Sequence, residues 1–488
     1  MSAKPLPPPW LLWWLTLIIG GVCFFSGLGD IPLLAQNEAR RALPAQAMFA
    51  TGDWLLPRLN GQLYLAKPPL LYWLATIASH FFGAVSEWST RLPSALAAAA
   101  ITLAACRYAL SRYGPWAALF TAQALIANTS FAMFARRAEI EMLLTALCCG
   151  ALLAVLRFIE DQQAGRRWIL LSYVLLGLAI LAKGPLALLF VTLPLLVHAL
   201  IYRQARAWQA LRDPAGWGLL LLVGGSWFLA VSLELGFDIW QATVQRDMLN
   251  KIHGVTAAPE PLFSYVLWLL ADFFPASLLL LAAPLATGRR WKDNHRLAAL
   301  LIAVAVPLLI FSAFSDKHAK YLLPLYPLLA LLAGKRLSEL MTTARPVWQR
   351  LLPALGLLMP LGYASFYTVA EARVFDYRYT GLMQFEQWIA SAGETPVYGY
   401  LSLDERALYY ARRTIPMLNP AEIEQKRAQQ SALLLLVDNN HLDAIAPQAD
   451  CTLRQFTPYL KRHKTLTVLG FGNVCQPAAG KASGSFVD

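Results

Sequence analysis

Long apolar runs without charged residues recur along most of this chain and constrain its fold more than any other feature. Of 488 residues, 57% are hydrophobic and 14% are charged, so polar side chains are too few to cover a soluble fold of this size. A helix that crosses a bilayer needs roughly 20 mostly apolar residues. The runs that qualify are 10–28, 92–111, 115–134, 142–158, 168–183, 185–202, 215–233, 262–286, 297–314, 320–334 and 347–368. The sequence therefore predicts an all-α polytopic membrane bundle of about eleven transmembrane helices.

Basic residues in alternate connections indicate the orientation of this bundle. Arg166 with Arg167, and Arg289 with Arg290, lie in two of these connections, and short loops rich in such residues usually face the cytoplasm. We therefore expect a cytoplasmic N-terminus. The apolar stretch 69–83 is short. Counting it as a crossing would place basic loops outside the cytoplasm, so we interpret it as an interfacial helix. Residues 29–90 then form one long external loop with juxtamembrane helices.

The net charge of +12 would suggest nucleic acid as a partner for a soluble protein. Here the excess lies largely in loops between apolar runs, so we expect membrane lipids as partners and no nucleic acid. Six cysteines show no metal-ligand spacing. Cys451 and Cys475 either pair in an oxidising compartment or remain free thiols.

The composition changes after residue 370, where charged residues return. This predicts two domains, a transmembrane part over 1–370 and a small α/β domain over 371–488 that ends in a flexible tail. Strands are expected at 395–400 and 432–437, and helices at 402–412 and 420–429. With about eleven spans and a cytoplasmic N-terminus, this domain lies in the periplasm.

Several charged residues fall on the predicted external side, against the trend for positive charge. The cations are Arg58, Lys67, Arg136, Lys183 and Lys320. Each could simply anchor lipid headgroups or extend its charge to the interface, but together they suit an anionic ligand such as a lipid-linked phosphate.

Carboxylates and one histidine accompany these cations. Glu38, Glu139 and Glu141 could act as a general base or position an acceptor. For Glu141 the simpler interpretation is a favourable charge at a helix N-terminus. His253 lies in a loop, where histidines are often inert.

The ordered motifs of the chain resemble those of polyprenyl-phosphate-dependent glycosyltransferases of the GT-C type. This group includes aminoarabinose lipid A transferases and protein O-mannosyltransferases. The motifs are N-E-A-R at 37–40, G-D-W-L-L-P-R-L-N-G at 52–61, K-P-P-L-L-Y-W at 67–73, R-L-P-S-A at 91–95, E-M-L-L-T at 141–145, K-G-P at 183–185 and Y-L-L-P-L-Y-P at 321–327. Each motif alone is weak, but the ordered set is specific.

The resemblance implies a GT-C bundle with a periplasmic C-terminal domain, a lipid-phosphate sugar donor and an inverting single displacement. The family's first-loop motif begins Asp-Glu, and its aspartate is the catalytic carboxylate. Here Asn37 stands at that position, and an amide is no useful base. Either Glu38 takes the role, or Glu141 in the second loop does, or activity is altered. Ala66, where the aminoarabinose branch often has Glu, counts against that particular sugar.

We therefore expect an inner-membrane hexosyl- or pentosyltransferase that moves a sugar from undecaprenyl phosphate to lipid A, another envelope glycan or protein. The donor phosphate would lie among Lys67, Lys183, Arg58, Arg136, Lys320 and Tyr321, with Glu139 and His253 as acceptor-side candidates. Fixed cations can replace a metal, so no cofactor is required, although this chemistry does not exclude a divalent ion. The alternatives are a lipid-linked sugar transporter, which would also carry charges in its membrane part, and a catalytically silent relative.

Overall fold

The computed structural model describes residues 10–244, 260–274, 276–277, 295–314, 317–393, 395–461 and 464–475. The chain divides into two compact units. The helical unit comprises Met1–Asp30, Pro44–Pro57 and Leu63–Ala370. The sheet unit comprises Ile31–Leu43, Arg58–Gln62 and Glu371–Asp488. Two segments of the predicted external loop therefore group with the C-terminal part of the chain, whereas the sequence prediction assigned them to the transmembrane part.

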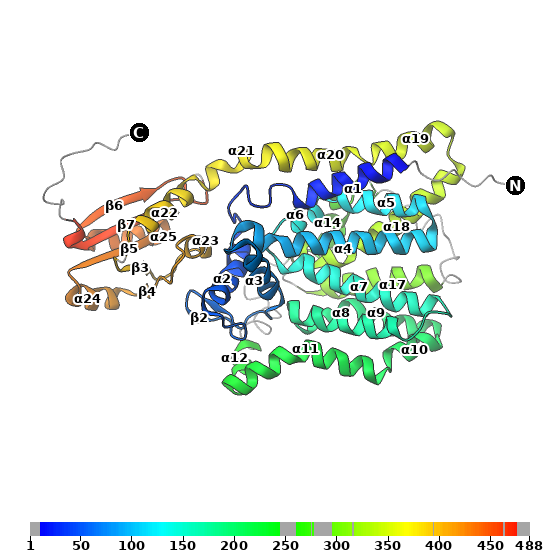
Figure 1. Ribbon diagram of the computed structural model, residues 1–488, viewed down its shortest axis with the longest axis horizontal. Coiled ribbons are helices and arrows are strands. Elements are labelled where there is room, and N and C mark those ends of the chain that lie inside the picture. Colours follow the sequence, from blue (N-terminus) through cyan, green and yellow to red (C-terminus); the bar gives the residue numbers. More distant parts are fainter. Residues whose placement is uncertain are drawn as a thin grey trace. The chain divides into compact units, whose positions relative to one another are not determined.

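Helices make up almost all of the helical unit (Figure 1). They are α1 (Trp10–Phe25), α3 (Leu70–Phe82), α4 (Glu87–Tyr113), α5 (Pro115–Ile126), α6 (Thr129–Ala135), α7 (Ile140–Glu160), α8 (Arg167–Lys183), η1 (Pro185–Ala187), α9 (Leu188–Tyr202), α10 (Ala205–Leu211), α11 (Pro214–Leu235), α12 (Ile239–Val244), α14 (Ser264–Asp272), α17 (His295–Ala313), η3 (Ala319–Leu325), α18 (Tyr326–Thr343), α19 (Pro346–Leu355), α20 (Leu358–Ser365) and η4 (Phe366–Ala370). The helix α2 (Gln36–Thr51) begins in the sheet unit and ends in the helical unit.

Each predicted span overlaps at least one of these helices, although much of 262–286 lies outside the described residues. Among the described residues, six helices are long and apolar enough to cross a bilayer, and α5 with α6 would make a seventh. The predicted span 115–134 is not one straight helix, because α5 and α6 meet at an angle of 71°. The side chain of Asn128 accepts a hydrogen bond from the Phe131 N–H and so starts α6 as a new helix.

The buried centre of the helical unit is α7, which packs against α8 and α4. The most extensive other contacts join α5 to α18 and α8 to α11. At the last of these, a Cβ on Gly224 would lie 3.2 Å from the carbonyl oxygen of Gly177. The two backbones can approach this closely because both positions lack a side chain, as is common between membrane helices.

The first-loop motif at 52–57 forms a turn in the helical unit. The Asp53 carboxylate accepts hydrogen bonds from the N–H groups of Leu55 and Leu56, both at 3.1 Å. The indole N–H of Trp73 on α3 donates to the Trp54 carbonyl at 2.7 Å. These bonds fix the chain between the end of α2 and α3.

The sheet unit contains a five-stranded mixed sheet in the order β4-β3-β5-β7-β6. The strands are β3 (Val397–Tyr400), β4 (Met417–Leu418), β5 (Ala432–Asp438), β6 (Cys451–Phe456) and β7 (Leu466–Gly472). Strand β3 is parallel to β4 and β5, whereas β7 is antiparallel to β5 and β6. In the register of β5 and β7, Leu435 lies opposite Leu469, and both are buried.

Helices and a small hairpin complete the sheet unit. The helices are α21 (Glu371–Phe375), η5 (Asp376–Arg378), α22 (Thr380–Ser391), α23 (Glu405–Tyr410), α24 (Pro420–Gln429), α25 (Asn439–Ile445), η6 (Ala446–Gln448) and η7 (Asn473–Cys475). The hairpin joins β1 (Arg58–Leu59) to β2 (Gln62–Leu63), of which Leu63 is already counted in the helical unit. All four elements expected from the sequence are present, but β4, β6 and β7 were not predicted. Of the two alternatives for Cys451 and Cys475, the structure shows the disulfide.

Candidate active site

Two buried carboxylates mark the start of α7. Glu139 is the N-cap residue and Glu141 lies in the first turn. The N-terminus of a helix favours negative charge, which explains why acidic residues are tolerated at this end of an apolar helix. The residues are only 4% and 7% exposed, respectively. Because a buried carboxylate needs a cation or hydrogen-bond donors, this pair requires partners from other elements.

Two lysines from distant parts of the chain supply these partners. Lys183 is the last residue of α8, and its Nζ donates to Glu141 Oε1 at 3.2 Å. Lys320 lies on η3, and its Nζ is 3.5 Å from the same Glu141 oxygen and 3.4 Å from Glu139 Oε2. The two lysines therefore share one carboxylate oxygen, and Lys320 links both glutamates.

Aromatic rings lie beside Lys183. The Lys183 ammonium is 5.1 Å from the ring centroid of Tyr321, within the range of a cation–π contact. The Tyr321 ring stacks on Phe311 at 5.9 Å and meets the His318 ring edge-on at 5.2 Å. These rings restrict where Lys183 and Tyr321 can move.

The charges of this cluster sum to a positive value. Arg137 completes it, with its Nη1 at 3.6 Å from Glu139 Oε1. The three cations and two carboxylates give 3 − 2 = +1. The cluster is therefore suited to a monoanion such as a phosphodiester. In the described part of the chain, no group of three or more His, Cys, Asp or Glu residues could hold a metal ion.

Two other predicted phosphate ligands contact main-chain carbonyls of their own unit. Arg136 donates from Nη1 to the carbonyls of Cys23, at 3.2 Å, and Ser26. Its guanidinium lies 4.1 Å from the ring centroid of Tyr367. These contacts fit a role in joining the end of α1 to the loop before α7. Lys67 donates from Nζ to the carbonyl of Ala66 at 2.9 Å.

The remaining predicted residues lie elsewhere. Arg58, Asn37 and Glu38 belong to the sheet unit. Arg58 is half-buried on β1, and Asn37 is half-buried near the start of α2. Glu38 is 2% exposed, and its Oε2 accepts from the Ala35 N–H at 3.4 Å. His253 lies outside the described residues.

The sequence interpretation did not place Arg137 and Ser94 among the site residues. The position of Arg137, two residues before Glu139, was a usable signal. Ser94 donates from Oγ to the Glu139 carbonyl at 3.3 Å and so attaches the N-cap of α7 to α4. Its place in the R-L-P-S-A motif gave no indication of this contact.

An apolar groove of about 560 Å³ lies between α3, α4, α7 and α8. Its lining includes Leu143, Leu147 and Gly150 of α7. These residues occupy the face of α7 opposite to Glu141, because a separation of two residues turns a helix through about 200°. The groove is therefore not continuous with the face on which Glu141 meets its lysines, and we leave it out of the site.

Comparison with known proteins identifies the family and the fold of this chain. Residues 66–233 match the dolichyl-phosphate-mannose-protein mannosyltransferase family, and residues 237–398 match the Alg9-like mannosyltransferase family. The undecaprenyl phosphate-alpha-4-amino-4-deoxy-L-arabinose arabinosyl transferase of Pseudomonas paraeruginosa is 31% identical over 343 residues, 67% of this chain and 60% of that protein. A protein of the same name from Sodalis glossinidius is 31% identical over 313 residues, 62% of this chain and 54% of that protein. The chain thus matches about 60% or less of the length of these relatives.

Two solved structures share the fold. ArnT from Cupriavidus metallidurans, bound to undecaprenyl phosphate, has a TM-score of 0.78 at 20% identity, covering 96% of this chain and 98% of that one. The oligosaccharyltransferase AglB from Archaeoglobus fulgidus has a TM-score of 0.55 at 13% identity, covering 89% and 70%. The fold is therefore that of the GT-C class, a helical membrane bundle followed by a smaller domain.

The chain belongs to the polyprenyl-phosphate-dependent glycosyltransferases of the GT-C type. It is a multi-pass protein of the inner membrane. Within that class, the relatives named above include aminoarabinosyl transferases, which agrees with the resemblance seen in the sequence.

Proposed function

We propose that this protein transfers a pentose or hexose from undecaprenyl phosphate to an acceptor on the periplasmic side of the inner membrane. The observation that carries the proposal is the buried cluster in which Lys183 and Lys320 share the Glu141 carboxylate. Its three cationic residues come from three separate motifs or loops, and its net charge of +1 complements a phosphodiester. The names of the arabinosyl transferase relatives support undecaprenyl phosphate as the carrier.

The lysines would stabilise the leaving group. As the bond from the anomeric carbon to the phosphate oxygen breaks, its electron pair moves to that oxygen, and the lipid phosphate gains negative charge. Cations held in place before the reaction stabilise this charge without reorganising. Glu139 and Glu141 act as counterions that hold Lys183, Lys320 and Arg137 in position, since each contacts at least one of these cations.

Glu38 is the carboxylate that we assign as general base. It follows Asn37, which stands where the resembling family carries its catalytic aspartate, and it is buried near the start of α2. Glu38 would take the proton of the acceptor hydroxyl while the hydroxyl oxygen forms its bond to the anomeric carbon from the face opposite the phosphate. The transfer is then a single displacement with inversion.

The proposal includes the orientation of the protein in the membrane and the acceptor of the sugar. The disulfide between Cys451 and Cys475 supports a periplasmic sheet unit, because structural disulfides persist in oxidising compartments. The N-terminus then lies in the cytoplasm. A periplasmic site can reach lipid A, another envelope glycan or a secreted protein, and we propose lipid A as the first acceptor to test.

The direct test uses purified full-length protein in detergent, where no membrane is present and transport cannot be detected. Undecaprenyl phosphate-alpha-4-amino-4-deoxy-L-arabinose and lipid A are supplied, and mass spectrometry follows the acceptor. A mass increase of one sugar supports the proposal. In parallel, a deletion strain and its complemented partner are compared for lipid A, envelope glycans and polyprenyl-phosphate sugars. The absence of transfer in vitro together with unchanged pools in the cell would contradict transferase function.

A further inference from the structure

The sheet unit contains two segments of the first loop, and one of them carries the assigned base Glu38. Ile31–Leu43 carries Asn37 and Glu38, and Arg58–Gln62 carries the last part of the G-D-W-L-L-P-R-L-N-G motif. Both segments contact the stretch 404–415 around α23, hundreds of residues away in the sequence. These contacts determine how the segment with Glu38 is held.

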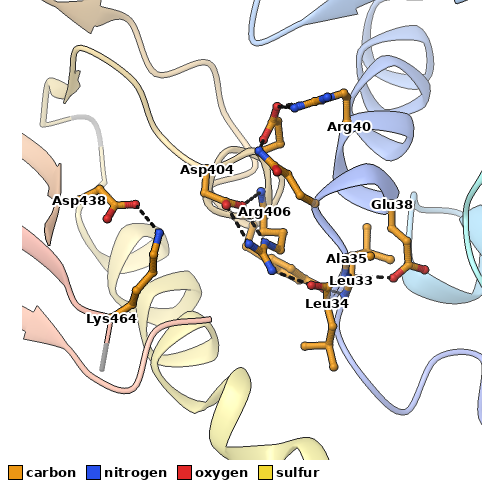
Figure 2. A network of polar contacts seen from close by, with 12 residues as sticks. Leu33, Leu34, Ala35, Glu38, Arg40, Asp404, Arg406, Asp438 and Lys464 are labelled. Carbon is orange, nitrogen blue, oxygen red and sulfur yellow. Dashed lines mark hydrogen bonds and ion pairs between the residues drawn. The ribbon is translucent and has the colours of Figure 1, made fainter. Parts of the chain in front are cut away.

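Two contacts fix the main chain just before α2. The Leu33 N–H donates to the Tyr410 hydroxyl at 2.8 Å, and Tyr410 is only 1% exposed. The Leu34 carbonyl accepts from Arg406 Nη1 at 2.6 Å. Figure 2 shows Arg406 reaching the Leu34 carbonyl near Ala35 and Glu38. The backbone four and five residues before Glu38 is therefore attached to α23.

An ion pair fixes α2 just after Glu38. Arg40 Nε donates to Glu405 Oε1 at 2.9 Å, and Gln36 Nε2 donates to the other oxygen of the same carboxylate at 2.5 Å. Gln36 and Arg40 are one helical turn apart, so Glu405 bridges the turn that contains Asn37 and Glu38.

Hydrogen bonds between Asp404 and Arg406 hold the first turn of α23 in place. Asp404 is its N-cap, with Oδ1 accepting from the Arg406 N–H. The Arg406 guanidinium also forms a two-pronged contact with Asp404, at 2.7 Å from Nε and 2.8 Å from Nη2. A planar bidentate pair of this kind fixes the orientation of the guanidinium as well as adding interaction energy. Arg406 is thus already oriented toward the Leu34 carbonyl.

A separate anchor holds the second segment. Asn60 donates from Nδ2 to the Ile415 carbonyl at 2.7 Å, and its Oδ1 accepts from the Ile415 N–H at 2.8 Å. Asn60 has a positive φ of 51°, a backbone conformation that asparagine tolerates better than most residues. The motif residue Asn60 therefore serves as an attachment point for the C-terminal part of the chain.

We propose that the stretch 404–415 sets the position of Glu38, so that Glu405, Arg406 and Tyr410 are positioning residues for sugar transfer. The C-terminal domain then acts on the chemistry through the first loop. This inference rests on the assignment of Glu38 under the proposed function. A displacement of about 1 Å at a reacting group can lower the rate roughly 100-fold, so the attachment of this one helical turn is functionally important.

A charge exchange tests the proposal in purified full-length protein. Arg40→Glu and Glu405→Arg are made singly and together, and transfer from undecaprenyl phosphate-alpha-4-amino-4-deoxy-L-arabinose to lipid A is measured. Each single change should lower kcat about 10- to 100-fold with little change in the donor KM, and the double variant should recover to within about threefold of the unmodified protein. Arg427→Glu is the matched control, because Arg427 also pairs with a carboxylate of the sheet unit and is 33% exposed, against 34% for Arg40.

Hydrogen–deuterium exchange gives a readout that does not depend on activity. Tyr410→Phe removes the acceptor of the Leu33 N–H while keeping the ring, and exchange in 31–43 should rise about fivefold. If exchange in 31–43 stays unchanged in both Tyr410→Phe and Glu405→Arg, the positioning role is wrong. If the single charge changes leave kcat unaltered while Glu38→Gln abolishes transfer, the positioning role is also wrong but the proposed function stands. If the unmodified protein transfers no sugar to any acceptor, the proposed function fails. The expected effect of Glu405, Arg406 and Tyr410 on sugar transfer then fails with it.

Discussion

Lys183 at the end of α8 donates to the Glu141 carboxylate in the first turn of α7 across 3.2 Å. The Lys183 side chain is 11% exposed and the Glu141 side chain 8%, so both are largely removed from water. Such a pair is costly to bury and gives little net stability. Under the proposed function, this pair keeps cations in place for the charge that develops on a leaving phosphate.

Replacing Lys183 by Met should reduce turnover strongly. The side chain keeps most of its apolar length but loses the ammonium that, under the proposed function, stabilises the leaving phosphate. Removal of one such group typically costs about 10²- to 10³-fold in kcat. Single-turnover transfer measured by mass spectrometry checks the effect. Lys335→Met is the control, since Lys335 pairs with Glu339 within α18 rather than in the cluster. Equal rates in both variants would remove Lys183 from the mechanism.

Glu141→Gln should weaken transfer by releasing both lysines from their shared oxygen. We expect a loss of roughly 10- to 100-fold, smaller than for Lys183→Met, because the cations remain but are less well placed. Glu160 on the same helix is an apt comparison, being 6% exposed and paired with Arg112. If Glu160→Gln lowers transfer as much as Glu141→Gln does at equal folded yield, the effect is one of stability and not of the site.

Glu38→Gln should lower kcat by about 10²- to 10⁴-fold, the range for loss of a general base. The geometry of the side chain is kept, so donor binding should hardly change. Asn37→Asp offers a complementary experiment, because it introduces the carboxylate that the resembling family carries at this position. The combined variant should regain part of the lost rate. Full activity in Glu38→Gln alone would reassign the base.

We expect Asp404 to stabilise the sheet unit at neutral pH and to lose this contribution at low pH. Burial by itself would raise the pKa of Asp404, but hydrogen bonds and charge from Arg406 outweigh it and lower this pKa from its ordinary value. A carboxylate with a lowered pKa stabilises the fold above its unfolded-state value and loses that contribution as the pH falls through the folded-state value. Asp404→Asn should therefore cost about 2 kcal/mol at neutral pH, and the difference should shrink below about pH 4.

The check on Asp404 is thermal unfolding of the full-length protein in detergent between pH 3 and pH 7. Asp443→Asn, at an exposed position on α25, provides a comparison that should show little change at any pH. A constant difference between the unmodified protein and Asp404→Asn across this range would show that the charge of Asp404 is not the cause.

The disulfide between Cys451 and Cys475 should stabilise the sheet unit by about 2–4 kcal/mol, because it closes a loop with a sequence separation of 24 residues. Cys451→Ser with Cys475→Ser should lower the unfolding temperature and increase proteolysis of 451–475. Alkylation of the protein from intact cells, before and after reduction, determines whether the pair is oxidised in vivo. Free thiols there would contradict the periplasmic placement. Cys106→Ser, outside the sheet unit, should leave both readouts unchanged.

The helices were predictable from the sequence because an apolar run near the length of a bilayer has few other folds available. The runs at 142–158 and 168–183 correspond closely to α7 and α8. The strands β3 and β5 were also predictable from short apolar runs. Strand β7 is a similar apolar run that was missed, whereas β6 is largely exposed and has no apolar run. The break at Asn128 was missed, because it depends on one side chain capping the next helix.

Residue types and motif order in the sequence determined the class of protein. They also identified most of the charged residues of the candidate site. Only the tertiary structure decided which of these charges meet. It brought Glu139 and Glu141 to Lys183 and Lys320, gave Arg136 main-chain partners, and attached the segment with Glu38 to Glu405 and Arg406. The physical reason is that ion pairs act over a few ångströms, and chain separations of tens to hundreds of residues leave no local pattern from which such contacts can be read.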